Sequence, residues 1–275
     1  MFAIKRISTF TISVLFNYPK RNYKGFRVLF FYMKVFITTL KNLNTLECHE
    51  CYLVYITDKK NIYFLKDRIL IDFKKHELKK HYLFLVDNDI LSDAMFVEDY
   101  FQEPYYKNEQ YEINDLVLQK VIQQYLIPLY NLRLTKSDGG YLKQLYERVK
   151  RLNLSSLDKY VFENINIIQS DEKIYIAMNH GDFWSGNIVK HKDSFKLIDW
   201  DDLSIKSLTF DIFHFYFQKL DADFIKFIDS YKDTKERVIP IVRGILDKTN
   251  TVEFIKNYDQ YVNCFILERM LKRYD

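Results

Sequence analysis

Cysteine is scarce in this sequence of 275 residues, and the few that occur exclude a disulfide framework. The chain has three cysteines, an odd number, at positions 48, 51 and 264. Their spacing does not match the disulfide patterns of small secreted proteins. Cys48 and Cys51 form a CxxC pair, but a second Cys or His pair at zinc-ligand spacing is missing. We therefore expect a cytoplasmic protein with two thiols on a strand and no metal or redox chemistry there.

Long apolar runs and a complete secretory signal are also missing. Near the N-terminus the longest apolar run, residues 28–33, falls far short of the roughly 20 residues that cross a bilayer. Lys5 and Arg6 precede a short apolar stretch that resembles the start of a signal peptide, yet no small-residue cleavage site follows. The sequence therefore predicts a soluble protein without a transmembrane segment.

Charge of one sign is not concentrated in a long block. The 41 basic and 37 acidic residues are interleaved, so the sequence predicts no nucleic-acid partner. Hydrophobic residues make up 48% of the chain and include 23 Phe and 22 Tyr, which excludes a disordered protein. The length suits one large domain or a two-lobed unit, and nothing indicates the oligomeric state.

The periodicity of the sequence changes near residue 100. Before it, two β-rich runs, residues 51–57 and 62–65, flank a polar turn and predict a hairpin. Residues 73–85 space their apolar side chains for one face of a helix. Residues 94–97 read as a strand that runs towards Pro104. We expect a β-rich N-terminal part over residues 1–98, whose first 40 residues have no clear role.

The part beyond residue 98 has mostly helical patterns, so we expect a larger, mostly helical part over residues 99–275. Asn114 is placed to cap the first of these helices, and Pro128 lies near its end. Two short strands are expected among the helices. The predicted helices span residues 114–128, 141–152, 210–220, 224–231 and 254–274, and the strands span residues 173–178 and 194–198. The fold class is therefore α+β.

Three polar side chains lie close to the predicted strands 173–178 and 194–198. Two lie between the strands and one directly follows the second strand. Asp182, Asn187 and Asp199 are separated by five and twelve residues, with a predicted strand before Asp199, and the three side chains can converge. Phosphoryl transfer from ATP needs a hard-cation site and a group that orients the attacking hydroxyl. An Asp and an Asn supply oxygen ligands for Mg²⁺, and a further Asp takes the hydroxyl proton late in transfer.

The residues around this loop resemble a known signature. Residues 180–187, HGDFWSGN, followed by residues 197–202, LIDWDD, resemble the HGDxxxxN…IDW(D/E) pattern of the aminoglycoside phosphotransferase and choline kinase family. The resemblance implies a two-lobed protein-kinase-like fold, with ATP and Mg²⁺ bound between the lobes. It also implies an enzyme that phosphorylates a hydroxylated small molecule.

Residue by residue, the resemblance assigns a role to each part of the signature. Asp182 is implied as the catalytic-loop carboxylate, and Asn187 and Asp199 as metal ligands. His180 is implied to brace the loop. Asp211 matches a later aspartate of the family and is expected to stabilise the loop.

The N-terminal part resembles the family less closely. Lys66 ends a strand that resembles the one whose lysine contacts the α and β phosphates, and Glu77 lies where a helix presents the paired carboxylate. Glu98 and Tyr100 lie in residues 96–101, which resemble the connector that meets the adenine. The alternative that Lys66 and Glu77 are solvent-exposed residues without a role stays open. Lys74 and Lys75 are rival candidates for the lysine that contacts the phosphates. Residues 41–50 should hold the phosphate-covering loop, but contain no glycine.

Three residues near the loop are candidates to line the acceptor site. Asp201 and Asp202 suit an aminosugar or a polyol, and the Trp184 ring suits a sugar or a choline-like cation. Alternatively, the two carboxylates cap the next helix or face solvent. His191 and His214 are expected on the surface and in the core. The acceptor candidates are a sugar or saccharide, including a cell-envelope glycan, then choline or ethanolamine, then an aminoglycoside.

Two other classes of function are alternatives to a kinase. A pseudokinase that binds a nucleotide or a partner without turnover is favoured by the missing glycines and opposed by the complete set of Asp182, Asn187 and Asp199. A metal-dependent hydrolase is disfavoured because no His pair has ligand spacing on one helix face. The kinase is therefore the preferred hypothesis.

Overall fold

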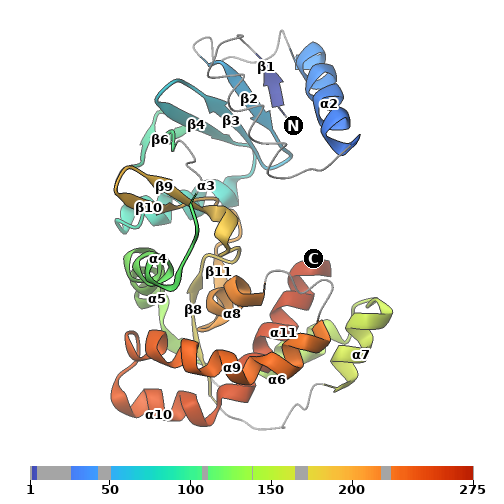
Figure 1. Cartoon of the computed structure of the whole chain (residues 1–275), viewed down its shortest axis with the longest axis vertical. Coiled ribbons are helices and arrows are strands. Elements are labelled where there is room, and N and C mark those ends of the chain that lie inside the picture. Colours follow the sequence, from blue (N-terminus) through green and yellow to red (C-terminus); the bar gives the residue numbers. More distant parts are fainter. Residues whose placement is uncertain are drawn as a thin grey trace. The chain divides into compact units, whose positions relative to one another are not determined.

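The computed structural model describes residues 2–4, 26–42, 51–106, 111–137, 139–164, 173–217 and 224–274. The chain divides into two compact units, Met1–Asn108 and Glu109–Asp275 (Figure 1). The first unit is built on a β-sheet and the second is mostly helical, so the predicted α+β fold is confirmed. The units divide after Asn108, whereas the sequence predicts a boundary after residue 98.

The first unit contains an antiparallel sheet of six strands in the order β1-β2-β3-β4-β6-β5. A helix, α2 (Phe26–Asn42), packs against the first of these strands. The strands are β1 (Phe2–Ile4), β2 (Leu53–Ile56), β3 (Lys60–Phe64), β4 (Arg68–Phe73), β5 (Met95–Val97) and β6 (Tyr100–Pro104).

The hairpin predicted near residue 60 is formed by β2 and β3, with Ile56 paired to Asn61. The Thr57 hydroxyl oxygen accepts the backbone N–H of Lys60 at 2.9 Å and so fixes the turn. Cys51 lies buried just before β2, whereas Cys48 and the glycine-free residues 43–50 lie outside the described residues. Two expectations therefore stay predictions. One is that both Cys48 and Cys51 lie on a strand, and the other is that residues 41–50 hold the phosphate-covering loop.

Strand β4 is absent from the sequence analysis, which places a helix directly after residue 72. The helix, α3, begins at His76 and ends at Asp87, and Phe73 is the last residue of β4. The Phe73 ring packs against the ring of Tyr82, a buried residue of α3, with 4.9 Å between ring centroids. Because Phe73 contacts the helix core from the strand, its spacing imitates a helical position.

The segment expected to connect the two parts of the chain is instead a hairpin within the first unit. Strands β5 and β6 pair with Val97 opposite Tyr100, and Glu98 turns the chain with a φ of 56°. The apolar run that suggested an extended connector is the β5 strand itself. Glu98 and Tyr100 therefore lie at a turn and at the start of a paired strand.

The second unit begins with a long helical segment. Asn114 caps it as predicted, since its side-chain oxygen accepts the Val117 N–H at 3.0 Å. The segment continues through Pro128, which is the second residue of α5 and follows directly on the π-helix η1. It comprises α4 (Asp115–Val121), the π-helix η1 (Ile122–Leu126) and α5 (Ile127–Arg133), and is followed by α6 (Tyr141–Val149) and α7 (Ser156–Asn164).

The described residues of this unit also form two small sheets and four further α-helices. One sheet has the strand order β11-β8-β7 and the other is the hairpin β9–β10. The predicted helix 254–274 is divided at Asn257 into two helices. The elements are β7 (Thr135–Lys136), β8 (Tyr175–Asn179), β9 (Ile188–His191), β10 (Ser194–Leu197), β11 (Ser204–Ser207), α8 (Phe210–Phe217), α9 (Phe224–Arg243), α10 (Lys248–Lys256) and α11 (Tyr258–Tyr274).

Helix α11 is anchored in the second unit by a buried carboxylate. Glu268 accepts the Ser207 backbone N–H, the Ser207 hydroxyl and the Tyr141 hydroxyl, each at 2.6 Å. Burial raises the pKa of Glu268, and these hydrogen bonds oppose the rise. The contacts join α11 to β11 and α6, which fixes the side of α11 that carries Lys272 one turn later.

Among the helices that the structure describes, none has the length and hydropathy needed to cross a membrane.

Candidate active site

The loop between β8 and the short 3₁₀ helix η2 (Ser185–Asn187) carries the predicted catalytic residues. Gly181 has a φ of +83°, a conformation that favours glycine. A Cβ atom at this position would lie 2.1 Å from the Asp202 carbonyl oxygen. Gly181 therefore lets the loop pass directly against the backbone at Asp202.

Asp211, in the first turn of α8, holds the start of the loop. Its carboxylate is fully buried and accepts the backbone N–H of His180 at 2.7 Å and that of Gly181 at 2.9 Å. The Tyr130 hydroxyl lies 3.5 Å from the same carboxylate. These contacts fix the loop backbone from helix α8. The bonded residues are about thirty positions apart in the sequence.

His180 is a buried structural contact of the loop. Its Nε2 donates to the Ile198 carbonyl at 3.1 Å, and its Nδ1 accepts the Asp182 backbone N–H at 3.2 Å. Burial lowers the pKa of His180, so the ring is neutral and these two roles agree with one tautomer. The ring also packs on buried Trp200, with 4.5 Å between centroids. His180 thus ties the loop to the segment before Asp199.

Asp182 is the most heavily contacted ionisable group of the loop. Its Oδ1 lies 2.9 Å from Lys272 Nζ and 3.3 Å from His214 Nε2, and its Oδ2 accepts from Asn187 Nδ2 at 3.1 Å. Burial acts to raise the pKa of Asp182, but the hydrogen bonds from His214 and Lys272 outweigh it and hold the pKa well below its usual range. The side chain is 33% exposed, so an ionised carboxylate faces solvent at this place.

Lys272 is a residue of the site that the sequence analysis missed. Its ammonium donates to Asp182 and Asp202 at 2.9 Å each, and to the Gly181 carbonyl at 2.8 Å. Burial opposes its charge, yet hydrogen bonds to both carboxylates raise the pKa of Lys272. The lysine lies 90 residues beyond Asp182 and outside the recognised signature, so no local pattern identifies it.

His214 was expected in the core, and it is indeed only 9% exposed. Its Nε2 nevertheless contacts Asp182, and its buried Nδ1 has no hydrogen-bond partner among the described residues. His214 lies three residues after Asp211 on α8, so the same helix contacts the loop twice. That helical spacing from Asp211 is the signal that identifies it in the sequence.

Asn187 and Asp199 are brought near each other by a backbone bond. The Ile198 N–H, one residue before Asp199, donates to the Asn187 carbonyl at 2.9 Å. Asn187 uses its Nδ2 to bond the Asp182 carbonyl at 2.8 Å, which leaves its Oδ1 as an oxygen donor. Asp199 is exposed, with a φ of 64°. The part of the chain that the structure describes holds no cluster of three His, Cys, Asp or Glu suited to a metal. Two oxygen donors suit Mg²⁺ only when phosphate oxygens and water complete its shell.

The three residues predicted to line the acceptor site differ in their contacts and burial. Asp202 is bonded to Lys272 and is followed by strand β11, so the alternative that it caps a helix is wrong. Asp201 is half-buried. The half-buried Trp184 ring lies over Gly186, where a Cβ atom would come within 2.2 Å of the ring. Trp184 therefore keeps its place because residue 186 has no side chain.

The predicted nucleotide residues of the first unit are held much less tightly. Lys66 is exposed in the turn after β3, and Glu98 is exposed in the β5–β6 turn. Glu77 is exposed and accepts from Lys80 at 3.0 Å, a contact that lowers the pKa of Glu77. The Tyr100 ring packs edge-on against Tyr63, with 6.0 Å between centroids. Their contacts with a nucleotide stay predictions.

Arg68 is a second basic candidate in this unit. It begins β4, the strand that directly precedes α3, and its buried Nε has no hydrogen-bond partner among the described residues. In protein kinases a lysine of the N-terminal sheet pairs with a glutamate of the αC helix. The sequence analysis missed Arg68 because it did not predict β4.

A model of the ecdysteroid kinase-like family matches residues 87–232, which is more than half of the chain. The chain belongs to the ecdysteroid kinase-like family. The match covers the loop at residues 180–187, Asp199 and Asp211, and it leaves out Lys66, Glu77 and Lys272. The predicted recognition is thereby confirmed, and so is the predicted enzyme class, a small-molecule kinase that phosphorylates an alcohol group.

Solved structures similar to this ecdysteroid kinase-like chain include three kinases of low identity. An ethanolamine kinase of Plasmodium vivax is 14% identical, with a TM-score of 0.47, over 94% of this chain and 87% of that chain. A choline/ethanolamine kinase family protein of Mesorhizobium loti is 9% identical, with a TM-score of 0.48, over 86% and 84%. A choline kinase of Streptococcus pneumoniae is 11% identical, with a TM-score of 0.40, over 89% and 93%. Among curated proteins no significant match is found.

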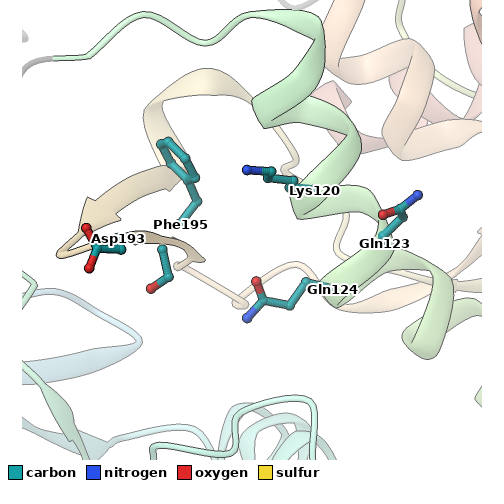
Figure 2. Close-up of a pocket in the computed structure, with 6 residues that line it drawn as sticks. Lys120, Gln123, Gln124, Asp193 and Phe195 are labelled. Carbon is teal, nitrogen blue, oxygen red and sulfur yellow. The ribbon is translucent and has the colours of Figure 1, made fainter.

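A shallow cavity of about 360 Å³ lies apart from the predicted residues of this kinase-like chain. Figure 2 shows Lys120 and Gln124 of the α4–η1 segment on the side of the β9–β10 hairpin, where Asp193 lies in the turn and Phe195 in β10. The cavity contains none of the loop residues and none of the acceptor candidates. Its lining is mostly exposed, so it indicates no enclosed ligand site.

Proposed function

We propose that this chain is an ATP- and Mg²⁺-dependent kinase that phosphorylates a hydroxyl group of a neutral small molecule, a sugar or saccharide. The observation that carries the proposal is the state of Asp182, which is ionised, partly exposed and fixed in place by three side chains. Membership of a kinase-like family supports the reaction class.

Asp182 has the capacity to bind one acceptor hydroxyl. A carboxylate offers about four acceptor positions, and Lys272, His214 and Asn187 use three of them. The fourth, on Oδ2, is available among the described residues and lies on a partly exposed side chain. A hydroxyl that donates to this oxygen is oriented for in-line attack, and its proton passes to Asp182 late in transfer. The low pKa keeps Asp182 ready to accept the hydrogen bond throughout.

Asn187 Oδ1 and the Asp199 carboxylate are the protein oxygens that would hold Mg²⁺. A bound Mg²⁺ supplies neutralisation of the charge on the nucleotide phosphates. The bond between Ile198 N–H and Asn187 keeps the two donors in register before any ligand binds. Asp182 then needs only to position the acceptor, because the phosphates and the hydroxyl are oriented by separate groups.

The charges around Asp182 favour a neutral acceptor over a cationic one. Asp202, a carboxylate expected to suit an aminosugar or a polyol, is bonded to Lys272 at 2.9 Å, which reduces its capacity to bind a cationic acceptor. Lys272 and His214 likewise occupy Asp182 Oδ1, so this oxygen has no position left for an ammonium group. Sugars and saccharides, including cell-envelope glycans, need only one acceptor position on Asp182 and match the Trp184 surface. Choline, ethanolamine and aminoglycosides rank below them.

The test is transfer of labelled γ-phosphate from ATP with Mg²⁺ into panels of neutral sugars and core saccharides, amino alcohols, and aminoglycosides. Wild type is compared with Asp182→Asn in each panel. Label in a neutral sugar that disappears in the variant supports both the reaction and the acceptor class. Label confined to an amino alcohol or an aminoglycoside supports the kinase and overturns the preference for a neutral acceptor.

The alternative is a pseudokinase that binds nucleotide without turnover. It is favoured by the exposed Lys66 and by the bond of Glu77 to Lys80 within its own helix. Saturable binding of Mg·ATP with no transfer into any panel, and no slow hydrolysis of ATP, would favour this alternative.

A further inference from the structure

Helix α2 of the first unit has an apolar face that is exposed. Leu29 and Phe30 are each 60% exposed, Met33 is 51%, Phe36 is 63% and Ile37 is 45%. At about 100° per residue these five positions fall within an arc of roughly 120° on the helix. Figure 1 shows α2 beside β1, against which it packs.

The helix is held to its unit by a different side. Phe31 and Val35 are 4% and 2% exposed, so they form the buried contact of α2. The described residues of the first unit therefore leave the exposed arc uncovered. Six of the fourteen large apolar side chains that are exposed in the described part of the chain belong to this one helix, and the others are scattered. A concentration of this kind marks a binding surface more often than a solvated one.

In the sequence before and through α2, every charged side chain is basic. Residues 1–46 contain eight Lys and Arg, and the first acidic residue of the chain is Glu47. Of the 41 basic residues, 33 therefore fall beyond residue 46 together with all 37 acidic residues, so the rest of the chain is net negative. Basic and acidic residues are therefore interleaved only from Glu47 onwards. Within α2, Arg27, Lys34 and Lys41 recur at intervals of seven residues.

We propose that α2 binds the surface of a membrane that contains anionic phospholipids. Its exposed apolar arc enters the boundary between head groups and acyl chains, and Lys34, with the other basic residues of this part of the sequence, meets the lipid phosphates. The helix has 17 residues, about 26 Å at 1.5 Å per residue, and carries three cations, so it lies along the surface instead of crossing the bilayer.

The charge pattern favours a lipid surface over the other occupants of such a face. Self-association through α2 would bring together two segments that each carry eight cations and no anion. A groove on a partner protein would need to supply compensating carboxylates around an apolar floor. An anionic bilayer supplies both the apolar layer and a continuous sheet of negative charge. The proposal does not depend on the proposed kinase reaction.

The test is sedimentation of the full-length protein with vesicles of phosphatidylcholine alone and of phosphatidylcholine mixed with phosphatidylserine. We expect binding to the mixed vesicles to be at least about tenfold stronger, and to weaken as salt is raised. The double variant Phe30→Ser/Phe36→Ser should weaken binding by about tenfold or more, because both exposed rings are removed. Lys34→Glu, at an exposed position, should weaken binding to the mixed vesicles and leave the weak binding to phosphatidylcholine unchanged.

The matched control is Met95→Ser/Val252→Ser, which removes two exposed apolar side chains from β5 and α10 and should bind as wild type does. Thermal unfolding checks that each variant is folded. Equal binding to both kinds of vesicle, or no binding to either, overturns the proposal. Sedimentation of the wild type as a dimer that Phe30→Ser/Phe36→Ser converts to a monomer, without vesicle binding, assigns the face to a second copy and also overturns it.

Discussion

The loop at residues 180–187 and the nucleotide candidates of the first unit differ in how their polar groups are held. In the loop, Asp182 is bonded by Lys272 of α11, His214 of α8 and Asn187 of the loop itself, and α8 also fixes the loop backbone through Asp211. In the first unit Lys66 and Glu77 are exposed, and Glu77 bonds its own helix. The loop therefore has its charge and geometry set by the fold, whereas the groups in the first unit would acquire theirs from a ligand.

The largest effect is expected when the negative charge of Asp182 is removed from the loop. Asp182→Asn keeps the size of the side chain but removes the acceptor for a hydroxyl proton and leaves Lys272 facing an amide. We expect kcat for phosphate transfer to fall about 10³-fold. Steady-state kinetics with a saturating acceptor measures it. Asp193→Asn, at an exposed turn, is the control and should keep wild-type kcat. A loss below about tenfold would mean that Asp182 is not the residue that positions the hydroxyl.

The second challenge removes the support of the loop without touching its chemistry. Asp211→Ala leaves the buried N–H groups of His180 and Gly181 without their acceptor. Each such group costs about 1–3 kcal/mol, so we expect the free energy of unfolding to fall by about 3 kcal/mol. Urea unfolding measures the change, with Asp193→Ala as the exposed control. A change within about 0.5 kcal/mol would show that the loop does not depend on α8.

The same contrast explains what the sequence could predict. The motif at residues 180–202 fixes residue types at close spacing, so the loop and its strands β8 and β10 were predicted from local pattern. Lys272 was missed because its contact with Asp182 exists only after α11 has been anchored by Glu268. Strand β4 was missed because Phe73 packs on α3 and so resembles a helical residue. Tertiary contact, which the periodicity of one segment does not contain, decided both cases.

A third prediction asks whether Lys272 sets the charge of Asp182. Lys272→Met keeps the apolar stem and removes the ammonium that lies 2.9 Å from the carboxylate. The pKa of Asp182 should rise by about one unit or more, because an opposite charge that favours ionisation is lost. We also expect kcat near neutral pH to fall about thirtyfold, since the carboxylate is less well positioned. The pH profile of kcat/KM measures the first effect and kcat the second.

The direction of the pH effect follows from the depressed pKa of Asp182. The stability that its ion pair contributes is present above the unfolded-state pKa of about 3.9 and is lost as the pH falls towards the lower folded-state value. In Lys272→Met part of this stability is already absent. On acidification the activity of the variant should begin to fall at a higher pH than that at which the activity of the wild type begins to fall. Lys256→Met, at an exposed position of α10, is the matched control. An unchanged acid limb would contradict a role for Lys272 in holding Asp182 ionised.

The smallest expected effect concerns the loosely held groups of the first unit, where two basic residues compete. Arg68 begins the strand that leads into α3 and has a buried Nε without a partner among the described residues, whereas Lys66 is exposed. A charged hydrogen bond to a phosphate is worth about 2 kcal/mol, so we expect Arg68→Met to lower kcat/KM for ATP by about tenfold or more. Lys66→Met should change it less than about twofold. The reverse order would restore Lys66 as the phosphate contact, and equal, small effects would mean that neither residue binds the nucleotide.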